Sequence, residues 1–531
     1  MRRWNEWDEG DGRGKGVRTF TRRQALATTA ATFGALALPN RWALAQTTQP
    51  QVDLLRFAWW SEVGAPTPFQ VSTVGPGGAV LLSLLYDTLT WKDGDGIIPW
   101  LATEWEGSAD GLTYTFQITN GALWHDGQPL TAADVAFSFS YYAQHPFRWM
   151  GTDVVAAAEA TSDRAVRIAL KRPYAAFLED ICGVVPIVPH HIWEPVADPI
   201  AYEGADRYVG SGPYTLAEYD ATNGAYRLLA NERYWNGRPL ASEWRQFVVP
   251  AEARVQIVQQ GEADVSLSND ASVRDVLAND ARLAVFETAP LSIVRLVVNP
   301  TTPPLDRVEV RQAIAYALDR ARIAETVTRG PAIVGGTGVV PPETPWYNPA
   351  VPQYGFDQIR AEELLGGERL TLSLIADPNA REPDLMVPML EAVGITLNVQ
   401  RTDAPTRTQL LTEGNFQLAL TSHIGVGADP DFLRRWYAGE EANAFAQGLI
   451  FANAEFTALA DEQATILDPA ARRPLVDRMQ VILAEQLPTI VLYHRRFYWV
   501  HDPAVFTPTP TWGGLMNGIP FPNNKLALLA R

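Results

Sequence analysis

The chain has 531 residues, 47% of them hydrophobic, and its 43 Lys and Arg against 60 Asp and Glu give a net charge of −17. This length suffices for about two to four lobes with buried cores, and the composition excludes a disordered or fibrous protein. The acidic excess argues against nucleic acid and anionic lipid as partners, because both recruit clustered Lys and Arg.

The first 45 residues have the pattern of an export signal. Arg22 and Arg23 precede an apolar run at 25–38, which is too short to span a bilayer at about 20 residues, and a small-x-small pattern ends at Ala45. The arginine pair resembles a twin-arginine signal, although Ala25 stands where that motif usually carries Phe. An ordinary secretory signal is the alternative. We expect cleavage near Ala45 and a soluble periplasmic chain without membrane insertion, since no later apolar stretch approaches membrane-spanning length.

Short strands and helices alternate along the rest of the chain, which predicts α/β lobes with mixed sheets. Alternating apolar residues predict half-buried strands at 114–118 and 166–170. Thr131 is the expected N-cap of a helix, with Asp134 near the first N–H groups. A second helix is predicted to begin at Asp306 and to end at Gly330.

Motifs for known chemistry are absent from the sequence: it has no GxSxG elbow, no HExxH helix and no P-loop lysine. Gly210-Ser211-Gly212 opens like a dinucleotide loop, but Pro213 and a strand-like stretch follow where a helix would have to begin. The single cysteine, Cys182, excludes a disulfide within the chain and a thiolate metal site. We therefore expect no enzymatic activity, no metal site and no cofactor.

Tryptophan is abundant, with 17 residues in the chain. Its large rigid ring and single N–H donor suit the enclosure of a small ligand. Trp59, Trp60 and Trp149 are our candidates for ligand contact, and core packing is the alternative for each.

Nine segments spread over nearly the whole chain carry the strongest signal. They are LYDTLTW (85–91), LATEW (101–105), WHDGQPLTAADVAFS (124–138), PIVPHHIW (186–193), VGSGPYTL (209–216), RLLANERYWNGRPL (227–240), NPTTPPLDRVEVRQAIAYALDR (299–320), GADPDFL (427–433) and LPTIVLY (487–493). In this order they resemble the family 5 extracellular solute-binding proteins of ABC importers, a class that includes dipeptide-, oligopeptide- and nickel-binding proteins.

This resemblance implies an α/β bilobal clamshell of the class II periplasmic-binding-protein type, with mixed sheets and an extra subdomain. Two strands would cross between the lobes, near 291–299 and 487–493. A small-molecule ligand held between the lobes would favour closure, which the ABC permease with its ATPase subunits would read. The protein would act as a monomer. The implied parts are lobe I at 46–86, 183–285 and 495–531, an inserted subdomain at 87–182, and lobe II at 286–494.

The resemblance also implies ligand-binding positions. In peptide-binding members an aspartate four positions before the proline of the GADPDFL-like segment holds the peptide's α-ammonium group. That position is Val426 here, and the family's tryptophan three residues earlier is His423. The missing carboxylate argues against a free peptide N-terminus held in this way. Asp429, just before Pro430, matches a more general family position, and we expect it to accept backbone N–H groups in a turn.

Polar residues on the expected crossing strands are further candidates. Arg295 interrupts an apolar strand, where its guanidinium would bind a carboxylate or phosphate, with an interlobe salt bridge as the alternative. Tyr493 and His494 would line the site where the chain returns. His423 is a candidate contact for a metal chelate, with a structural hydrogen bond as the alternative.

The sequence therefore predicts an exported, non-enzymatic receptor that captures a small peptide-like or opine-like solute and delivers it to an ABC importer. Receptors of the same fold for an oligosaccharide or a metal chelate are alternatives. A cofactor enzyme exported by the twin-arginine route is the alternative from another class.

Overall fold

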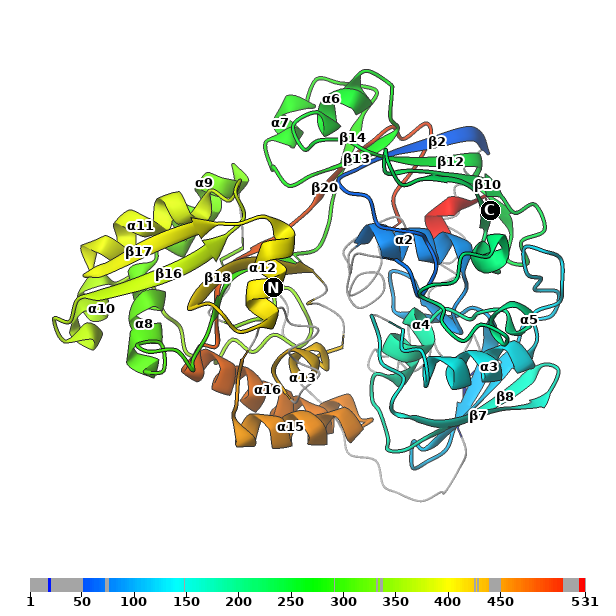
Figure 1. Cartoon of the computed structure of the whole chain (residues 1–531), viewed down its shortest axis with the longest axis horizontal. Coiled ribbons are helices and arrows are strands. Elements are labelled where there is room, and N and C mark those ends of the chain that lie inside the picture. Colours follow the sequence, from blue (N-terminus) through cyan, green and yellow to red (C-terminus); the bar gives the residue numbers. More distant parts are fainter. Residues whose placement is uncertain are drawn as a thin grey trace, which may run out of the picture.

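The computed structural model describes residues 18–20, 51–71, 76–147, 149–290, 292–330, 333–334, 338–424, 426, 429–438, 450–509 and 525–530. Apart from 18–20, the expected export signal lies outside these residues. The chain forms two halves that lie side by side and are joined near β14 and β20 at the top of Figure 1. None of the helices in the described ranges combines the length and the hydropathy that a bilayer crossing requires.

A mixed seven-stranded sheet organises the first half, in the order β14-β20-β13-β2-β12-β10-β9. Strand β2 lies parallel to β12 and β13, and the remaining neighbours are antiparallel. Its strands are β2 (Val52–Trp59), β9 (Tyr214–Asp220), β10 (Ala225–Ala230), β12 (Ala241–Val248), β13 (Val265–Ser268), β14 (Ala284–Glu287) and β20 (Tyr498–His501). The helices of this half are α2 (Pro76–Leu85), α3 (Ala132–Tyr142), α4 (Cys182–Val184), α5 (His190–Trp193), α6 (Arg254–Gln259) and α7 (Val273–Val276).

A second, antiparallel sheet of the first half has the order β1-β5-β6-β8-β7. Strands β6 and β8 confirm the two half-buried strands expected from the alternating pattern, and Tyr114, Phe116 and Ile118 point to the buried side. The strands are β1 (Arg18–Phe20), β5 (Ala102–Gly107), β6 (Thr113–Ile118), β7 (Val155–Ser162) and β8 (Ala165–Leu170). Smaller elements nearby are β3 (Thr90–Lys92), β4 (Ile97–Pro99), η2 (Phe177–Ile181), η3 (Ala205–Tyr208), β11 (Arg238–Pro239), η4 (Lys525–Leu528) and β21 (Leu529–Ala530).

Helix α3 begins where the sequence predicts. Thr131 is its N-cap, and the Thr131 backbone N–H donates to Asp134 Oδ2 at 2.8 Å. Asp134 also accepts a hydrogen bond from the His190 backbone N–H at 3.1 Å. The same carboxylate therefore caps the helix and ties it to a segment more than fifty residues away.

The second half is built on a five-stranded sheet with the order β17-β16-β18-β15-β19. Strand β16 is parallel to β17 and β18, whereas β15 is antiparallel to β18 and β19. The strands are β15 (Ser292–Val298), β16 (Leu370–Ala376), β17 (Ile395–Arg401), β18 (Leu418–Ile424) and β19 (Thr489–Arg495). One face packs against α8 (Val308–Ala317), α9 (Arg320–Thr328), α10 (Gln358–Leu365) and α11 (Glu382–Ala392). The other face packs against α12 (Ala404–Thr412), α13 (Phe432–Tyr437), α15 (Ala454–Thr465) and α16 (Pro469–Gln486).

The expectation of one helix from Asp306 to Gly330 is wrong, because the chain forms α8 and α9 instead. Leu318 between them has extended backbone, with φ −95° and ψ 116°. Asp319 then caps α9 by accepting from the Arg322 backbone N–H at 3.0 Å. An N-cap carboxylate inside the apolar pattern thus ends one helix and begins the next.

The two halves are connected through neighbouring segments of the chain. Within the described ranges, the main chain passes between the two large sheets after β14 and again after β19, next to the strands that the sequence expected to cross. The passages pair with each other, since the Thr288 N–H donates to the Phe497 carbonyl and the Phe497 N–H donates to Thr288 Oγ1, both at 3.0 Å. Arg496 forms ion pairs with Glu287 on one side and Glu343 on the other. We call residues 288–290 and 496–497 the hinge segments.

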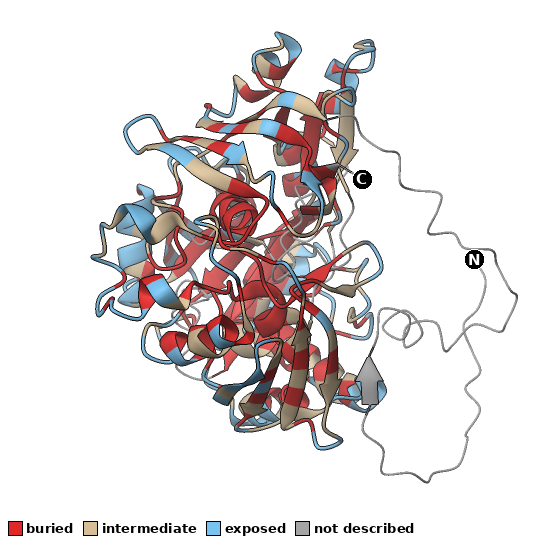
Figure 2. Cartoon of the chain, turned by 90° about the vertical axis from the view of Figure 1, so that its right-hand side faces the viewer, coloured by how far each residue is buried: buried red, intermediate tan, exposed pale blue. Residues whose placement is uncertain are grey.

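The hydrophobic core of the first half is continuous across both of its sheets. One cluster joins Phe57 of β2 to Phe116 of β6 and Ile168 of β8. It also includes Ala464 from α15 and packs against Ile424 from β18, so parts of the second half contact it directly. Figure 2 shows buried residues along the inner faces of the sheets and exposed residues on the outer turns.

A buried ion pair joins several of the family-like segments of the first half. Asp87 and Lys525 are both fully buried, and Lys525 Nζ lies 2.8 Å from Asp87 Oδ1. Asp87 also accepts hydrogen bonds from Trp100 Nε1 at 2.7 Å, the Tyr234 hydroxyl at 2.9 Å and the Ser211 hydroxyl at 3.2 Å. The carboxylate therefore organises segments that are far apart in the sequence.

The Gly210-Ser211-Gly212 stretch has a packing role in this arrangement. A Cβ at Gly210 would lie 1.9 Å from the Leu85 carbonyl oxygen, and one at Gly212 would lie 2.3 Å from the Leu84 carbonyl oxygen. Both approaches are impossible for any other residue. The glycines thus bring this segment onto the end of α2.

We expect Asp87→Asn to lower the free energy of unfolding by about 3 to 5 kcal/mol, because it leaves Lys525 buried without a carboxylate. Urea unfolding of the variant measures this loss. Asp53→Asn at an exposed position is the matched control and changes the free energy by less than about 0.5 kcal/mol. The double variant Asp87→Asn/Lys525→Met recovers part of the loss, and equal losses in Asp87→Asn and the control would contradict the assignment.

Candidate functional site

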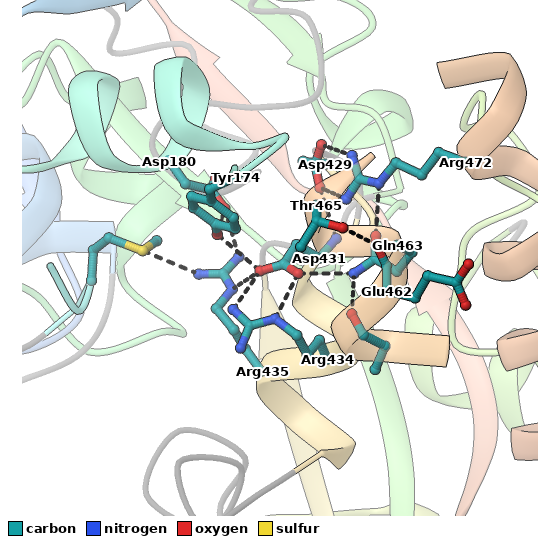
Figure 3. Close-up of polar contacts among 12 residues, drawn as sticks. Tyr174, Asp180, Asp429, Asp431, Arg434, Arg435, Glu462, Gln463, Thr465 and Arg472 are labelled. Carbon is teal, nitrogen blue, oxygen red and sulfur yellow. Dashed lines mark hydrogen bonds and ion pairs between the residues drawn. The ribbon is translucent and has the colours of Figure 1, made fainter. Parts of the chain in front are cut away.

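The two halves meet again away from the hinge segments, where residues 174–180 contact α13 and α15. The Ala175 backbone N–H donates to the Ala464 carbonyl at 2.8 Å. Charged and polar side chains from both halves gather around this contact (Figure 3). We call this set the junction cluster; it consists of Tyr174 and Asp180 from the first half and Asp431, Arg434, Arg435 and Gln463 from the second.

Asp431 is the centre of the junction cluster and is fully buried. It accepts hydrogen bonds from Arg434 Nε at 2.8 Å and Gln463 Nε2 at 2.9 Å within its own half, and from the Tyr174 hydroxyl at 2.8 Å across the junction. Burial raises the pKa of Asp431, but the guanidinium groups of Arg434 and Arg435 outweigh it and lower the pKa to about 2. Asp431 is therefore ionised in the folded protein at neutral pH.

Asp180 supplies a second carboxylate, from the opposite half. It is fully buried, its Oδ2 lies 3.3 Å from Arg435 Nη2 across the junction, and the Tyr174 hydroxyl donates to it at 3.4 Å. Burial raises the pKa of Asp180 to about 7, against the attraction of Arg435. Asp180 Oδ1 is buried without a hydrogen-bond partner in the described part of the chain. The cluster thus combines one carboxylate that is strongly favoured as an anion with one that is poorly compensated.

Asp429 lies beside the cluster and has the structural role that the sequence predicts. Its Oδ1 accepts a hydrogen bond from the Asp431 backbone N–H at 2.8 Å. Arg472 also binds it through both terminal nitrogens, at 2.6 Å each, and donates from Nε to Gln463 Oε1 at 2.7 Å. The bidentate ion pair with Arg472 therefore occupies the Asp429 carboxylate, which the resemblance implied as a candidate ligand contact.

Arg295 is fully buried within the second half, between β15 and α13. Its guanidinium carbon lies 4.5 Å from the centre of the Trp436 ring, and its Nε donates to Thr421 Oγ1 at 3.3 Å. It shares a strand face with Ile293 and Val297, which belong to the core beneath α13. The alternation places Arg295 opposite Val294 and Leu296 as expected, but that face is covered by α13.

The two family positions on either side of β18's end are also enclosed. His423 packs edge-on against Trp436 with ring centres 4.3 Å apart, and its Nδ1 contacts the Ile424 carbonyl. Burial lowers the pKa of His423 to about 3, and the nearby Arg295 charge adds to the effect. Val426 is fully buried in the apolar cluster of this face. An uncharged imidazole and an apolar side chain therefore stand at the two positions for which the resemblance implied a tryptophan and a carboxylate.

The candidate tryptophans lie over the start of α2. Trp59 stacks on Trp60 at 4.3 Å between ring centres, and Trp59 and Trp149 are almost fully buried while Trp60 keeps part of its surface exposed. A Cβ at Gly77 would lie 2.3 Å from Trp59 Nε1, and one at Gly78 would lie 3.0 Å from the Trp149 ring. Trp59 and Trp149 therefore pack against the start of α2, whereas Trp60 keeps part of its surface exposed, and ligand contact by the three remains a prediction.

Tyr493 and His494 are buried near the end of β19. The Tyr493 hydroxyl donates to Glu382 Oε1 at 2.8 Å, which directs the side chain toward α11. The His494 backbone N–H donates to the Ile333 carbonyl at 2.8 Å. Burial lowers the pKa of His494 to about 3. Within the described residues, no three His, Cys, Asp or Glu side chains come together as metal ligands would.

Sequence reasoning missed the junction cluster. Asp180 stands in an apolar stretch, and Arg434-Arg435 follow directly after the GADPDFL segment inside a short helix with a buried side. Charges at such positions are a usable signal, because a buried charge needs a partner. The sequence alone does not indicate that the partners come from opposite halves.

Comparisons with known proteins agree on one group. The family model of bacterial extracellular solute-binding proteins, family 5 Middle, matches residues 96–445. The dipeptide-binding protein of Escherichia coli is 27% identical over 501 residues, covering 85% of this chain and 91% of its own length. Heme-binding protein A of Haemophilus influenzae is 27% identical over 438 residues, covering 76% of this chain and 80% of its own.

A solved structure shows the same fold. The ABC transporter-associated periplasmic binding protein DppA of Helicobacter pylori, in complex with the peptide STSA, superimposes with a TM-score of 0.78 at 21% identity. The match covers 91% of this chain and 99% of that one. The fold is therefore the α/β fold of periplasmic binding proteins, with mixed sheets.

The junction cluster makes stability depend on pH in a specific way. Because the pKa of Asp180 is raised from 3.8 to about 7, the folded protein binds more protons than the unfolded chain in that window, and stability falls as pH rises through it. Asp180→Asn cannot ionise at this position. We therefore expect the free energy of unfolding, measured with urea, to fall by about 1 to 4 kcal/mol less in this variant than in the wild type between about pH 4 and 8. Asp53→Asn keeps the wild-type profile. Identical profiles for Asp180→Asn and the wild type would refute the assignment.

Proposed function

Since this chain belongs to the family 5 bacterial extracellular solute-binding proteins, we propose that it captures a small peptide-like solute between its two halves and delivers it to an ABC permease and its ATPase subunits. Members of the family are binding proteins of ABC importers, so the chain is a transport protein and not an enzyme. The finer points, which are the solute, the closure and the export route, are our proposal.

The observation that carries the proposal is the way the halves are joined. The hinge segments lie side by side and pair with each other. Charged groups of the two halves also meet at the Arg329–Asp270 ion pair, 3.2 Å long, and in the junction cluster. Rotation about the hinge segments would separate Tyr174 and Asp180 from Asp431 and Arg435. A solute that contacts both halves binds the closed form more tightly and shifts the population toward it. Inverting a 1:99 population needs a preference of about 10⁴-fold.

The solute class follows from the residues that replace the family's ammonium site. Relatives include a dipeptide-binding protein and a structure with a bound peptide, which favours a peptide-like or opine-like solute. Val426 provides no carboxylate for an α-ammonium group, so we propose that the amino end of the solute is neutral or is bound elsewhere. The packing of Trp59 and Trp149 over α2 weakens the case for an oligosaccharide platform.

We also propose that residues 1–45 are an export signal of the twin-arginine type, that cleavage occurs near Ala45, and that the mature chain acts as a monomer in the periplasm. The extracellular nature of the family supports export. Cleavage at this point would remove β1, which pairs with β5 in the full chain.

Binding of dipeptides and of their N-acetylated forms tests the proposed function. We expect a dipeptide that binds to raise the free energy of unfolding, by about 2.7 kcal/mol at a hundred times its dissociation constant, and to make the protein more compact in X-ray scattering. Because Val426 replaces the carboxylate, we expect N-acetylation to weaken binding by no more than about threefold.

A solute retained in native mass spectrometry of gently purified protein identifies the probe for these measurements. A loss above about tenfold on acetylation would show that the ammonium group is recognised elsewhere in the site. Failure of every dipeptide, or chemical turnover of a solute that binds, would refute the proposed function.

A further inference from the structure

Arg495, a half-buried arginine at the boundary between the halves, differs from the arginines near it. Arg495 is the last residue of β19, directly before a hinge segment. Its guanidinium lies over the Phe497 ring at 5.2 Å, and it forms no hydrogen bond or ion pair with any described residue. Its Nε is buried without a hydrogen-bond partner. In contrast, Arg472 is paired with Asp429, and the neighbouring Arg496 has carboxylates on both sides.

A second polar group without a described partner lies directly opposite. Ser292, the first residue of β15, is the cross-strand neighbour of Arg495. It is fully buried, and its hydroxyl has no hydrogen-bond partner in the described part of the chain. Residues directly opposite in an antiparallel pair project on the same face, with Cβ atoms about 4.5 to 5.5 Å apart. Both side chains therefore start from neighbouring positions on the same face of the sheet.

This pair is on the side of the sheet end that faces the first half. The other cross-strand neighbour of Ser292 is Ile424, which packs against the hydrophobic core of the first half. Phe497, beneath the guanidinium, belongs to the same core. Ile424, Ser292 and Arg495 thus form a row across three strands at the end of the sheet next to the first half.

The charges around Arg495 leave its guanidinium poorly compensated. Burial lowers its pKa, and the opposing influences come from Tyr493 and from Glu382. Glu382 is already engaged by the Tyr493 hydroxyl at 2.8 Å. A buried donor without a partner, as Arg495 Nε is, carries a desolvation cost, and an anion placed against it offsets that cost. A guanidinium and a hydroxyl together supply donors in the arrangement that suits a carboxylate.

We propose that Arg495 and Ser292 form a carboxylate-binding site at the hinge, which takes the carboxylate of the transported solute. This inference rests on the proposed function and narrows the solute to an organic acid, whether a peptide with a free C-terminus or another carboxylate. Because the site adjoins both hinge segments, its occupation links recognition of the acid group to the position of the two halves.

The test follows the Arg495 side chain directly by the NMR signal of its Nε–H group, assigned as the signal lost in Arg495→Gln. The probes are sodium acetate, as the smallest carboxylate, alanyl-leucine, and alanyl-leucine amide, in buffers of equal ionic strength. We expect saturable shifts of this signal with acetate and with alanyl-leucine, and none with the amide. We expect Arg495→Gln to weaken alanyl-leucine binding by about 10- to 100-fold and Ser292→Ala to weaken it less.

Three controls separate the possible outcomes. Arg245→Gln, at a more exposed arginine of β12, leaves binding unchanged. Ligand-free Arg495→Gln unfolds at the same urea concentration as the wild type or a higher one, whereas a merely structural arginine would make the variant less stable. Arg495→Lys restores part of the binding, because it keeps the charge without the planar donors.

The proposed function and the carboxylate site fail in different ways. If alanyl-leucine binds the wild type and Arg495→Gln equally well, the site is refuted and the transport function stands. If acetate shifts the Arg495 signal but no peptide does, the carboxylate site stands and the peptide-like solute is refuted. If neither acetate nor alanyl-leucine shifts the signal, the site is refuted.

Discussion

Charges from opposite halves share one buried junction, and neither half keeps its own set compensated alone. Asp180 is fully buried and Arg435 is nearly so, and the two pair across the boundary between the halves, while Arg435 also lies 3.9 Å from Asp431 in its own half. Opening the molecule would have to hydrate both ions and break the Tyr174–Asp431 hydrogen bond. Exposure to water returns much of the hydration free energy that these ions lose on burial. This gain offsets part of the free energy lost when the contacts between the halves break.

The hinge and the junction cluster have complementary roles in this balance. The hinge segments are joined to each other through Thr288 and Phe497. The junction cluster and the Arg329–Asp270 ion pair add charged contacts between the halves away from these segments. The junction cluster does not stabilise the contact between the halves as much as it could, because the raised pKa of Asp180 shows that the charge of this carboxylate is incompletely offset. A receptor needs this intermediate setting, because a closed form that is too stable without solute would respond weakly to binding.

Local features of the fold were predictable from the sequence, whereas the elements that cover each face of a sheet were not. The cap at Thr131 and the alternation at 114–118 depend on neighbours in sequence, and both are confirmed. The break at Asp319 was missed because the apolar spacing continues across it. Alternation placed Arg295 on the correct face of its strand but did not show that α13 covers that face. Asp180 and Arg435 meet only through the tertiary fold, which no local pattern encodes.

The segments that resemble the family hold the fold together more than they determine the ligand. We call the contacts that they make within each half the frame of the molecule. Asp87 and the two glycines at 210 and 212 hold segments together inside the first half, and Asp429 is neutralised by Arg472. Such groups persist in any receptor that needs the same frame, whatever it carries. The groups that distinguish a solute have to be polar atoms that the frame leaves unpaired near the boundary between the halves. Arg495 Nε and the Ser292 hydroxyl meet that condition, whereas Val426 is part of the core and His423 packs against Trp436.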